Sequence, residues 1–248
     1  MLLKKDEFDT KFLGLNSYKL YIDETTKTTF NDIKLSLNKI VTPSLVCCIV
    51  PWGHTYIPNL LAEGFELIGT KSKYGQKLDR PSEILISSTD VKIISSFSGE
   101  SEIFGDGDID AYSTLIETLS KVSRYYKDPA ISKNYSKKIY KAWFFNSLFN
   151  GYADEVLVAQ YNQLNVGFMS LKISNKTALI DLVVVDPRYQ NLSIGAILLS
   201  HAKQHLQDLG INYITVETEA ENIAANRFYQ KNGFLSEDFT LVLHKHVT

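Results

Sequence analysis

The sequence predicts an α/β protein whose mixed β-sheet is flanked by helices on both faces. Short apolar runs bounded by turn residues predict strands, and apolar residues three or four apart predict helices between them. A strand at 178–185, a helix at 193–209 and a strand at 213–217 predict a parallel, right-handed crossover. Hairpins elsewhere predict antiparallel pairs, so both strand orientations are expected.

Residues 1–98 predict a small α/β domain. Its strands and helices are expected to alternate, at 18–22, 30–37, 45–50, 57–62 and 65–68. The polar segment 71–81 is typical of a loop, whereas 84–87 and 91–97 are strand-like. Three glycines and five acidic residues follow between 98 and 110. This composition predicts a domain boundary, although a substrate-facing loop would share it.

The second domain is expected to occupy residues 99–248. A first helix starts near Asp108, and a second at 135–149 has an aromatic face that includes Trp143 and Phe144. That face is compatible with packing between the domains or with a homodimer contact. The later strands and helices are expected at 155–161, 166–173, 178–185, 193–209, 213–217, 222–232 and 239–244.

Composition narrows the class of protein. The formal net charge is -2, so no overall basic field points to nucleic acid or an anionic membrane. No apolar run reaches transmembrane length, and residues 1–8 lack the apolar region of a signal peptide, which predicts a cytoplasmic protein. Cys47 and Cys48 are strand neighbours that point to opposite faces, so buried thiols are expected rather than a disulfide.

The segment 180–199 predicts an anion site. It combines a buried strand, a break at Asp186 and Pro187, and a turn that places Gly195 at the start of a helix. Such a turn directs free backbone N–H groups and the positive end of the helix dipole to one point, most naturally a phosphate. On its own this pattern is weak, because ordinary strand-to-helix connections share it.

A second motif makes the first one specific. The helix at 222–232 and its end carry N-x-x-A-x-x-x-Y-x-K-x-G-F, formed by Asn222, Ala225, Tyr229, Lys231, Gly233 and Phe234. The preceding turn carries Val185, Asp186, Pro187, Gln190, Ser193, Gly195 and Ala196 at matching spacing. With both motifs, roughly residues 100–248 resemble the GNAT superfamily of acetyl-CoA-dependent N-acetyltransferases.

The resemblance implies a splayed central sheet, with acetyl-CoA as co-substrate. Backbone groups of residues 183–185 would hold the pantetheine arm, and the amides of the turn would hold the pyrophosphate. Tyr229 would lie near the thioester sulfur as general acid. The cofactor-binding residues that it implies are Val183, Val184, Val185, Gln190, Asn191, Leu192, Ser193, Ile194, Gly195, Ala196, Asn222, Ala225 and Asn226.

Ser193 stands where the family has glycine. A serine hydroxyl can hydrogen-bond phosphate, so weaker but real cofactor binding is expected. If the position requires a positive φ, the site is instead degraded. The second case leaves open a binding module that keeps the fold and has lost turnover.

The sequence leaves the general base open. Glu217 is the candidate, with Glu219, Asp181 and His54 as alternatives, and a water chain would also serve. Strand alternation places Glu217 and Glu219 on one face, and Asp181 on the face of residues 183 and 185.

No group of histidine, cysteine and aspartate has metal-ligand spacing, so no metal is expected. The histidines outside the motifs are expected mostly at the surface, namely His201, His205, His244 and His246.

A looser resemblance concerns the acceptor. Spaced residues are similar to those of the dTDP-fucosamine N-acetyltransferases and their relatives, namely Asp9, Phe12, Gly14, Asn16, Ser17, Gly64, Phe65, Arg124, Tyr125, Pro129, Tyr140 and Trp143. It implies a nucleotide-linked amino-dideoxy sugar used for surface polysaccharide such as lipopolysaccharide. Arg124, Tyr125 and Asn16 would then bind that substrate. A protein amine or a polyamine is the alternative acceptor, and an acidic pocket would favour the polyamine.

Overall fold

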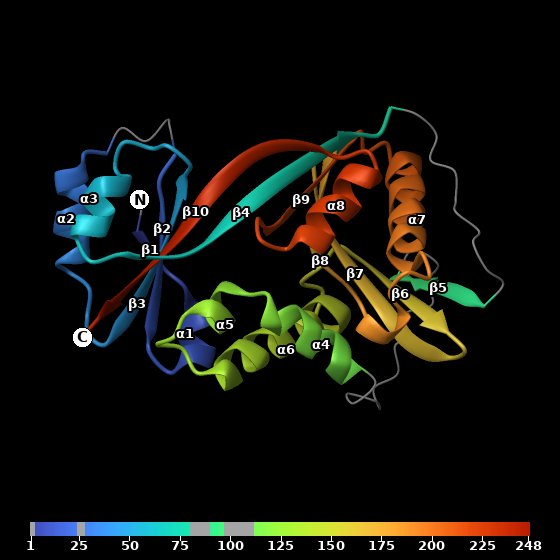
Figure 1. The fold of residues 1–248 in the computed structure, drawn as a ribbon, viewed down its shortest axis with the longest axis horizontal. Helices are drawn as coiled ribbons and strands as arrows, with labels where there is room; N and C mark the ends of the chain where they lie inside the picture. Colours follow the sequence, from blue (N-terminus) through green and yellow to red (C-terminus); the bar gives the residue numbers. More distant parts are fainter. Residues whose placement is uncertain (1–2, 24–27, 80–89, 97–111) are drawn as a thin grey trace.

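The computed structural model describes residues 3–23, 28–79, 90–96 and 112–248 (Figure 1). The first half contains β1 (Leu3–Lys5), α1 (Glu7–Leu13), β2 (Asn16–Tyr21), α2 (Phe30–Leu37), β3 (Ser44–Pro51), α3 (Ile57–Ala62) and β4 (Glu66–Lys77). The second contains β5 (Val91–Ser95), α4 (Ser113–Lys121), α5 (Arg124–Lys127), α6 (Lys133–Phe149), β6 (Glu155–Tyr161), β7 (Leu164–Ser174), β8 (Thr177–Val185), η4 (Pro187–Tyr189), α7 (Ile194–Asp208), β9 (Tyr213–Glu219), α8 (Ile223–Lys231) and β10 (Leu235–Val247).

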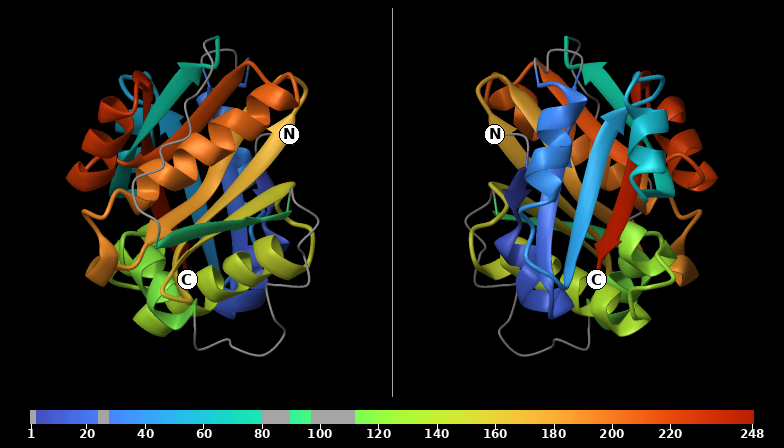
Figure 2. Two further views of the ribbon diagram at one scale, coloured as in Figure 1. Left: turned by 90° about the vertical axis from the view of Figure 1, so that its right-hand side faces the viewer. Right: turned by 90° about the vertical axis from the view of Figure 1, so that its left-hand side faces the viewer.

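All described strands form one mixed sheet, in the order β1-β2-β3-β10-β4-β9-β8-β7-β6-β5. Helices α2, α3, α7 and α8 cover one face, and α1, α4, α5 and α6 cover the other (Figures 1 and 2). The predicted mixed α/β architecture is therefore confirmed. The expected parallel crossover joins β8 to β9, and the expected hairpins pair β6 with β7 and β7 with β8.

The two halves of the chain exchange one strand each. The series β2-α2-β3-α3-β4 repeats as β8-α7-β9-α8-β10, with a parallel pair opening each series. Strand β10 inserts between β3 and β4, and β4 inserts between β10 and β9. All three pairings are antiparallel, and β4 and β10 cross the middle of the molecule together (Figure 1). The halves are thus related by an approximate two-fold arrangement around this pair.

Strand β4 is longer than the sequence predicted. Residues 71–77 belong to it, so the expected loop at 71–81 is wrong over that part. Its side chains alternate between the two faces of the sheet. Ser72 and Tyr74 are buried on one face, while Lys71 and Lys73 form ion pairs with glutamates on the other. The lysines interrupt the apolar pattern that would predict a strand. The glutamates that pair with them lie on strands remote in the sequence, so the pairing cannot be seen from the sequence of β4.

Several sequence predictions fall outside the described residues. These are the strand at 84–87, the acidic run at 98–110 and the helix start near Asp108. The proposed domain boundary lies in the same stretch and stays a prediction. Cys47 and Cys48 are buried free thiols, as expected. None of the helices in the described part of the chain is both long and apolar enough to cross a membrane.

The sheet opens between β8 and β9. In the first half, β2 and β3 stay paired from Asn16 to Tyr21. In the second half, the equivalent pairing covers only Thr177–Ile180 of β8 and then stops. A β-bulge at Asp181 marks the point of divergence, because Ile180 and Leu182 pair with adjacent residues of β7. Residues 181–185 consequently present one strand edge that β9 does not cover.

Candidate active site

A cavity of about 860 Å³ occupies the opening between β8 and β9. Its lining comes from both sides of the sheet. On one side lie the start of α7 and the helix α8, and on the other lie α4 and α6. The divergence of the two strands therefore connects the two faces of the sheet. A two-substrate reaction could take place here, with one substrate entering from each face.

The start of α7 is open to a ligand. Its N-cap residue Ser193 makes no side-chain capping bond, so the N–H groups of the first helical turn lack that partner. By contrast, Thr29 and Asp32 close the equivalent end of α2 with a reciprocal capping box. The Asp32 carboxylate accepts hydrogen bonds from the backbone N–H and the hydroxyl of Thr29 at the start of α2. Of these two equivalent helix ends, that of α2 is capped and that of α7 is open.

Ser193 adopts the left-handed conformation, with φ of 60°. A positive φ at this position is the case for which the sequence predicts a degraded site. A left-handed non-glycine residue costs about 1–2 kcal/mol, yet it still directs the amides of α7 toward the cavity. The conformation thus strains the turn without closing it.

Replacing Ser193 with glycine should raise the free energy of unfolding by about 0.5–1 kcal/mol. Relief of the left-handed strain is offset in part by the greater freedom of glycine in the unfolded chain. Urea unfolding of wild type, Ser193→Gly and Ser193→Ala will measure this. Equal stability of the glycine and alanine variants would show that the backbone is not strained here.

Gly195 lets α7 and α8 approach each other at the turn. A Cβ atom there would lie 3.3 Å from Cε2 of Phe228, closer than ordinary contact. Phe228 and Gly195 both line the cavity, so a larger residue would fill space beside the helix start. Packing as well as ligand access therefore favours glycine here.

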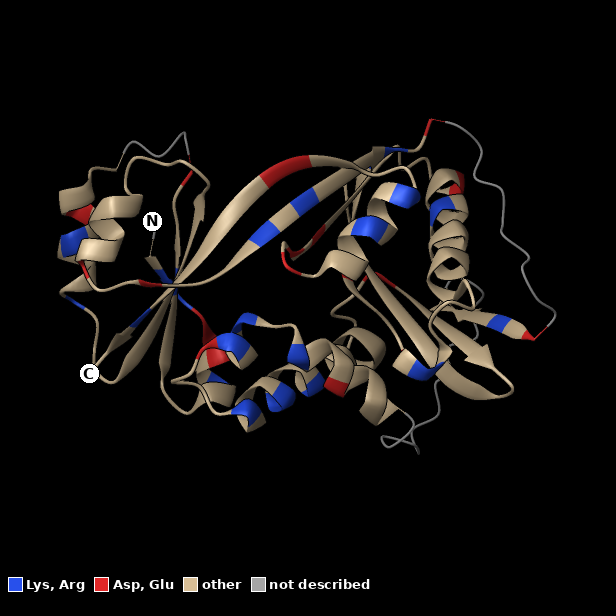
Figure 3. Ribbon diagram, in the orientation of Figure 1, with Lys and Arg blue, Asp and Glu red and all other residues tan. Residues whose placement is uncertain are grey.

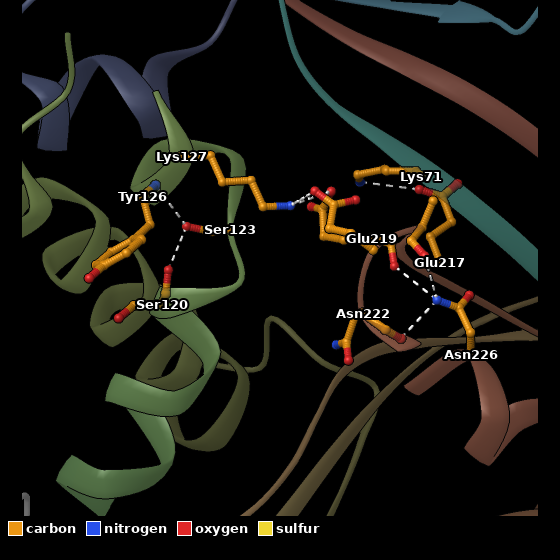
Figure 4. A network of polar contacts seen from close by, with 11 residues as sticks. Lys71, Ser120, Ser123, Tyr126, Lys127, Glu217, Glu219, Asn222 and Asn226 are labelled. Atoms are coloured by element: carbon orange, nitrogen blue, oxygen red, sulfur yellow. Dashed lines mark hydrogen bonds and ion pairs between the residues drawn. The ribbon is translucent and has the colours of Figure 1, made fainter. Parts of the chain in front are cut away.

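Two asparagines shape the entrance to α8 (Figure 4). Asn222 is the N-cap, and its Oδ1 accepts a hydrogen bond from the amide of Ala225 at 3.2 Å. The Asn226 amide donates to the carbonyls of Glu219, Ala220 and Asn222, within 3.2 Å in each case. Its Oδ1 accepts from the hydroxyl of Tyr74 at 2.8 Å. Asn226 thus fixes the loop that follows β9.

Tyr229 lies in the cavity wall and is only 3% exposed. Its ring packs against Tyr74 and Phe234, with centroids 5.8 and 5.5 Å away. Burial raises the pKa of its phenol above the ordinary value of 10.0. The hydroxyl consequently stays protonated at neutral pH and can serve as a proton donor.

Most of the cofactor residues implied by the sequence meet at this cavity. Those that line it are Val183, Val184, Val185, Gln190, Asn191, Ser193, Ile194, Gly195, Ala196, Asn222 and Ala225. Leu192 is exposed and lies outside the lining. Asn226 also lies outside it and instead fixes the loop after β9 through its hydrogen bonds. The remaining assignments agree with a cofactor running from the edge of β8 to the start of α7.

The other half of the cavity is acidic. Asp181, Glu217 and Glu219 line it together with Tyr140, Trp143 and one lysine, Lys71, which forms an ion pair with Glu217. Figure 3 shows acidic residues gathered at the end of β9 and in the loop before α8. This half of the lining suits a positively charged group.

Asp181 does not share a face with Val183 and Val185, contrary to the alternation argument. Its carboxylate accepts a 2.8 Å hydrogen bond from the indole of Trp143 in α6, whereas the two valines pack against the core beneath α7. The bulge at this position reverses the alternation. Burial raises the pKa of Asp181, and the bond from Trp143 opposes this only in part.

The substrate residues suggested by the sequence, Arg124, Tyr125 and Asn16, do not line the cavity, and neither does His54, an alternative candidate for the general base. Tyr125 is 3% exposed and donates to Asp9 at 2.5 Å, while Arg124 pairs with the same carboxylate at 3.4 Å. This cluster joins α5 to α1. Asn16 opens β2 opposite Ser44, and the imidazole of His54 accepts a bond from the amide of Tyr56. All four residues instead make contacts within the fold, away from the cavity.

One group of described residues could hold a metal ion. Asp128, His244 and His246 bring their ligand-type atoms within 4.8 Å of one another. Both imidazoles contact the same oxygen of Asp128, at 2.6 and 2.9 Å. His244 is fully buried, so its expected surface position is wrong. Alternation over His244-x-His246 in β10 places both rings on one face and was the sequence signal that could have predicted the cluster.

The Asp128 cluster should make stability depend on pH. Burial alone would raise the pKa of Asp128, but the bonds from His244 and His246 outweigh it and lower that pKa to about 2. Burial lowers the pKa of His244, yet its bond to Asp128 raises it overall. The aspartate contribution is therefore lost as pH falls from about 4 toward 2, and the histidine contribution declines above about 6.5.

Asp128→Asn should lower the free energy of unfolding by about 2 kcal/mol at pH 5.5 and by less at pH 8.5. Urea unfolding of both proteins at these two pH values measures the difference. A loss that is the same at both pH values would contradict the coupling between Asp128 and His244.

Comparisons with known proteins agree with this geometry. Residues 119–234 match the model of the acetyltransferase (GNAT) family. The chain is 28% identical over 138 residues to the spore coat polysaccharide biosynthesis protein SpsD of Bacillus subtilis, covering 56% of this chain and 47% of SpsD. It is 30% identical over 107 residues to the uncharacterized N-acetyltransferase MJ1207 of Methanocaldococcus jannaschii, covering 40% and 47%. It thus spans about half the length of these curated relatives.

The fold has solved counterparts over nearly its whole length. A GCN5-related N-acetyltransferase from Sphaerobacter thermophilus superposes with a TM-score of 0.64 at 12% identity. The match covers 98% of this chain and 76% of that protein. The similarity in fold therefore extends over both halves of the chain.

Proposed function

We propose that the chain, which has the GNAT fold and whose residues 119–234 match the model of the acetyltransferase (GNAT) family, transfers acetyl groups from acetyl-CoA to a primary amine. The observation that carries the proposal is the cavity between β8 and β9, which joins the open start of α7 to an acidic chamber. One end suits a pyrophosphate and the other suits an amine.

In this proposal the chain positions the reactants and moves protons. The free edge of β8 at residues 183–185 pairs with the amide groups of the pantetheine, as an added strand would. The amides of Gly195 and Ala196 bind the pyrophosphate. Tyr229 donates a proton to the departing thiolate. A backbone N–H at the same strand edge stabilises the oxyanion that forms during attack.

The finer proposal for the acceptor is the amine of a nucleotide-linked, dTDP-type amino-dideoxy sugar used for surface polysaccharide. Support comes from the similarity to SpsD, a spore coat polysaccharide biosynthesis protein, and from the aromatic wall of Tyr140 and Trp143. Aromatic faces are suited to pack on sugar rings. Arg124 and Tyr125, which the sequence suggests for the nucleotide, are not among the residues that line the cavity.

A small polyamine is the second candidate acceptor. The acidic lining favours it, because a flexible polycation needs carboxylates and no nucleotide subsite. The strained turn at Ser193 is the one feature that favours a third possibility, a non-catalytic acyl-CoA-binding module.

Thermal unfolding with acetyl-CoA, dTDP-amino sugars and spermidine separates these functions. We expect stabilisation by acetyl-CoA and by one class of amine, with release of free CoA when both are present. Stabilisation by acetyl-CoA and by no nucleotide sugar would remove the sugar-nucleotide acceptor. Absence of any effect of acetyl-CoA would remove acetyl transfer itself.

A further inference from the structure

Three side chains converge outside the cavity, where the end of α5 meets β10. Asp128 is the C-cap residue of α5, and His244 and His246 lie on one face of β10. Oδ2 of Asp128 lies 2.6 Å from Nδ1 of His244 and 2.9 Å from Nε2 of His246. The three residues bring their ligand-type atoms within 4.8 Å of one another. One carboxylate oxygen and two imidazole nitrogens form a ligand set that suits Zn2+.

The spacing of these atoms needs only a small change to admit an ion. Tetrahedral Zn2+ with ligand bonds of about 2.0 Å keeps its ligand atoms about 3.3 Å apart. The distances of 2.6 and 2.9 Å to Asp128 fall short of this value by less than about 1 Å. His246 can supply the change, because its side chain is 30% exposed whereas the other two side chains are enclosed. An ion can also enter from that side.

Bonds outside the cluster hold the two buried ligand residues. The Oδ1 atom of Asp128 accepts a 2.9 Å hydrogen bond from the amide of Ala130, which leaves Oδ2 directed at the imidazoles. The backbone of His244 is held from both sides, because β10 pairs with β3 and with β4 at this position. Outer bonds of this kind orient the ligands of a metal site before the metal arrives.

The imidazole of His244 supplies an independent indication of a ligand. The residue is only 1% exposed, and its Nε2 atom is inaccessible and has no hydrogen-bond partner among the described residues. An unpaired nitrogen in a buried ring costs free energy, which a strong bond at the other nitrogen offsets. A metal ion at Nδ1 provides such a bond. Cys47 lies opposite His244 on β3, but its sulfur is not one of the clustered ligand atoms.

The local charge is compatible with a divalent cation. Asp128 contributes one negative charge, and imidazoles are neutral when they bind a metal. Arg124 is a positive group that interacts with His244, and the carboxylate of Asp9 lies 3.4 Å from its guanidinium. The positive charge next to the cluster therefore has a carboxylate partner of its own.

We propose that Asp128, His244 and His246 form a binding site for one Zn2+ ion. The ion binds Oδ2 of Asp128, Nδ1 of His244 and Nε2 of His246, and a water molecule takes the fourth position on the solvent side of His246. With three protein ligands the ion is exchangeable. The sequence predicts no metal here because Asp128 lies 116 residues from His244, and only the fold brings them together.

The ion joins α5 to β10 beside the acidic end of the cavity. Lys127, the neighbour of Asp128, ends α5, and its Nζ lies 3.4 Å from a carboxylate oxygen of Glu219 in the cavity lining. None of the three ligand residues lines the cavity itself. Zn2+ should therefore stabilise the fold and leave the affinity for acetyl-CoA unchanged.

Titration of ZnCl2 into the tag-free, EDTA-treated full chain tests the site by calorimetry. Wild type should bind one ion per chain, with a rise in Tm. His246→Gln should bind at least about 100-fold more weakly, because loss of even an outer partner costs about 10–100-fold. MgCl2 should give no response, since Mg2+ prefers oxygen ligands. Absence of saturable Zn2+ binding by wild type, or undiminished binding by His246→Gln, would overturn the proposal.

His205→Gln is the matched control. His205 also lies beside a carboxylate, with its Nε2 atom 3.7 Å from Glu155, but it does not belong to the cluster. This variant should bind Zn2+ as wild type does, and equal weakening in both histidine variants would contradict the assignment. Urea unfolding without metal checks that His246→Gln is folded, which its partly exposed position favours.

Co2+ in place of Zn2+ gives a readout on wild type that needs no variant. Four-coordinate Co2+ with oxygen and nitrogen ligands should show intense visible d–d bands and no thiolate charge-transfer band. Added ZnCl2 should abolish these bands by competition. A thiolate band would show that Cys47 is a ligand and would overturn the ligand set, as would the weak visible bands of six-coordinate Co2+.

Discussion

Replacing Tyr229 with phenylalanine should lower kcat by about 100-fold or more, while acetyl-CoA affinity changes by less than about threefold. The phenol lies in the cavity wall, and burial raises its pKa, so it is protonated when the thiolate leaves. Phenylalanine retains the ring contacts with Tyr74 and Phe234. The loss should therefore appear in the chemical step rather than in folding or binding.

Steady-state kinetics and calorimetric titration of acetyl-CoA will distinguish these effects. Tyr161→Phe is a suitable control, since Tyr161 packs against the same core but does not line the cavity. An unchanged kcat in Tyr229→Phe would remove this residue from the acid role and leave it as a packing residue.

Gly195→Val should abolish measurable acetyl-CoA binding, a loss of at least 100-fold in affinity. A first added carbon already lies 3.3 Å from Phe228, and the two further methyl groups fill the space beside the start of α7. Anion binding there depends on close approach to backbone N–H groups, which a branched side chain prevents. Gly195→Ala should give a smaller loss, because only the first carbon is added.

The approximate two-fold arrangement supplies the control for Gly195→Val. Asn31 occupies the corresponding second position of α2, where the capping box of Thr29 and Asp32 closes the helix end. Asn31→Val should consequently leave acetyl-CoA binding unchanged, although both variants place a β-branched residue in a first helical turn. Equal losses in the two variants would indicate a general effect on folding.

The half of the cavity at the start of α7 could be predicted from the sequence, because the motifs that form it are local. The turn before α7 and the helix α8 each carry their functional positions within about a dozen residues, at fixed spacing. Strand, turn and helix are local elements, so spacing converts directly into position. Ser193 and Tyr229 accordingly line the cavity, as the motifs implied.

The acidic half of the cavity could not be predicted in the same way, because it forms where strands that are remote in the sequence pair with one another. Strand β4 meets β9 and β10 across more than 130 residues of sequence, and this places Lys71 beside Glu217. The bulge at Asp181 turns one carboxylate to the opposite face. Burial distinguishes Glu219 from Glu217, although the sequence presents them as near equals. Tertiary context decided each of these features.

Calorimetric titration of acetyl-CoA into the full chain tests the central claim most directly. The claim is that the divergence of β8 and β9, with the uncapped start of α7, makes one cofactor site, whereas the paired strands and capped α2 of the first half make none. The expected result is saturable binding of one acetyl-CoA per chain, lost in Gly195→Val. Binding of two per chain, no binding, or full binding by Gly195→Val would contradict it.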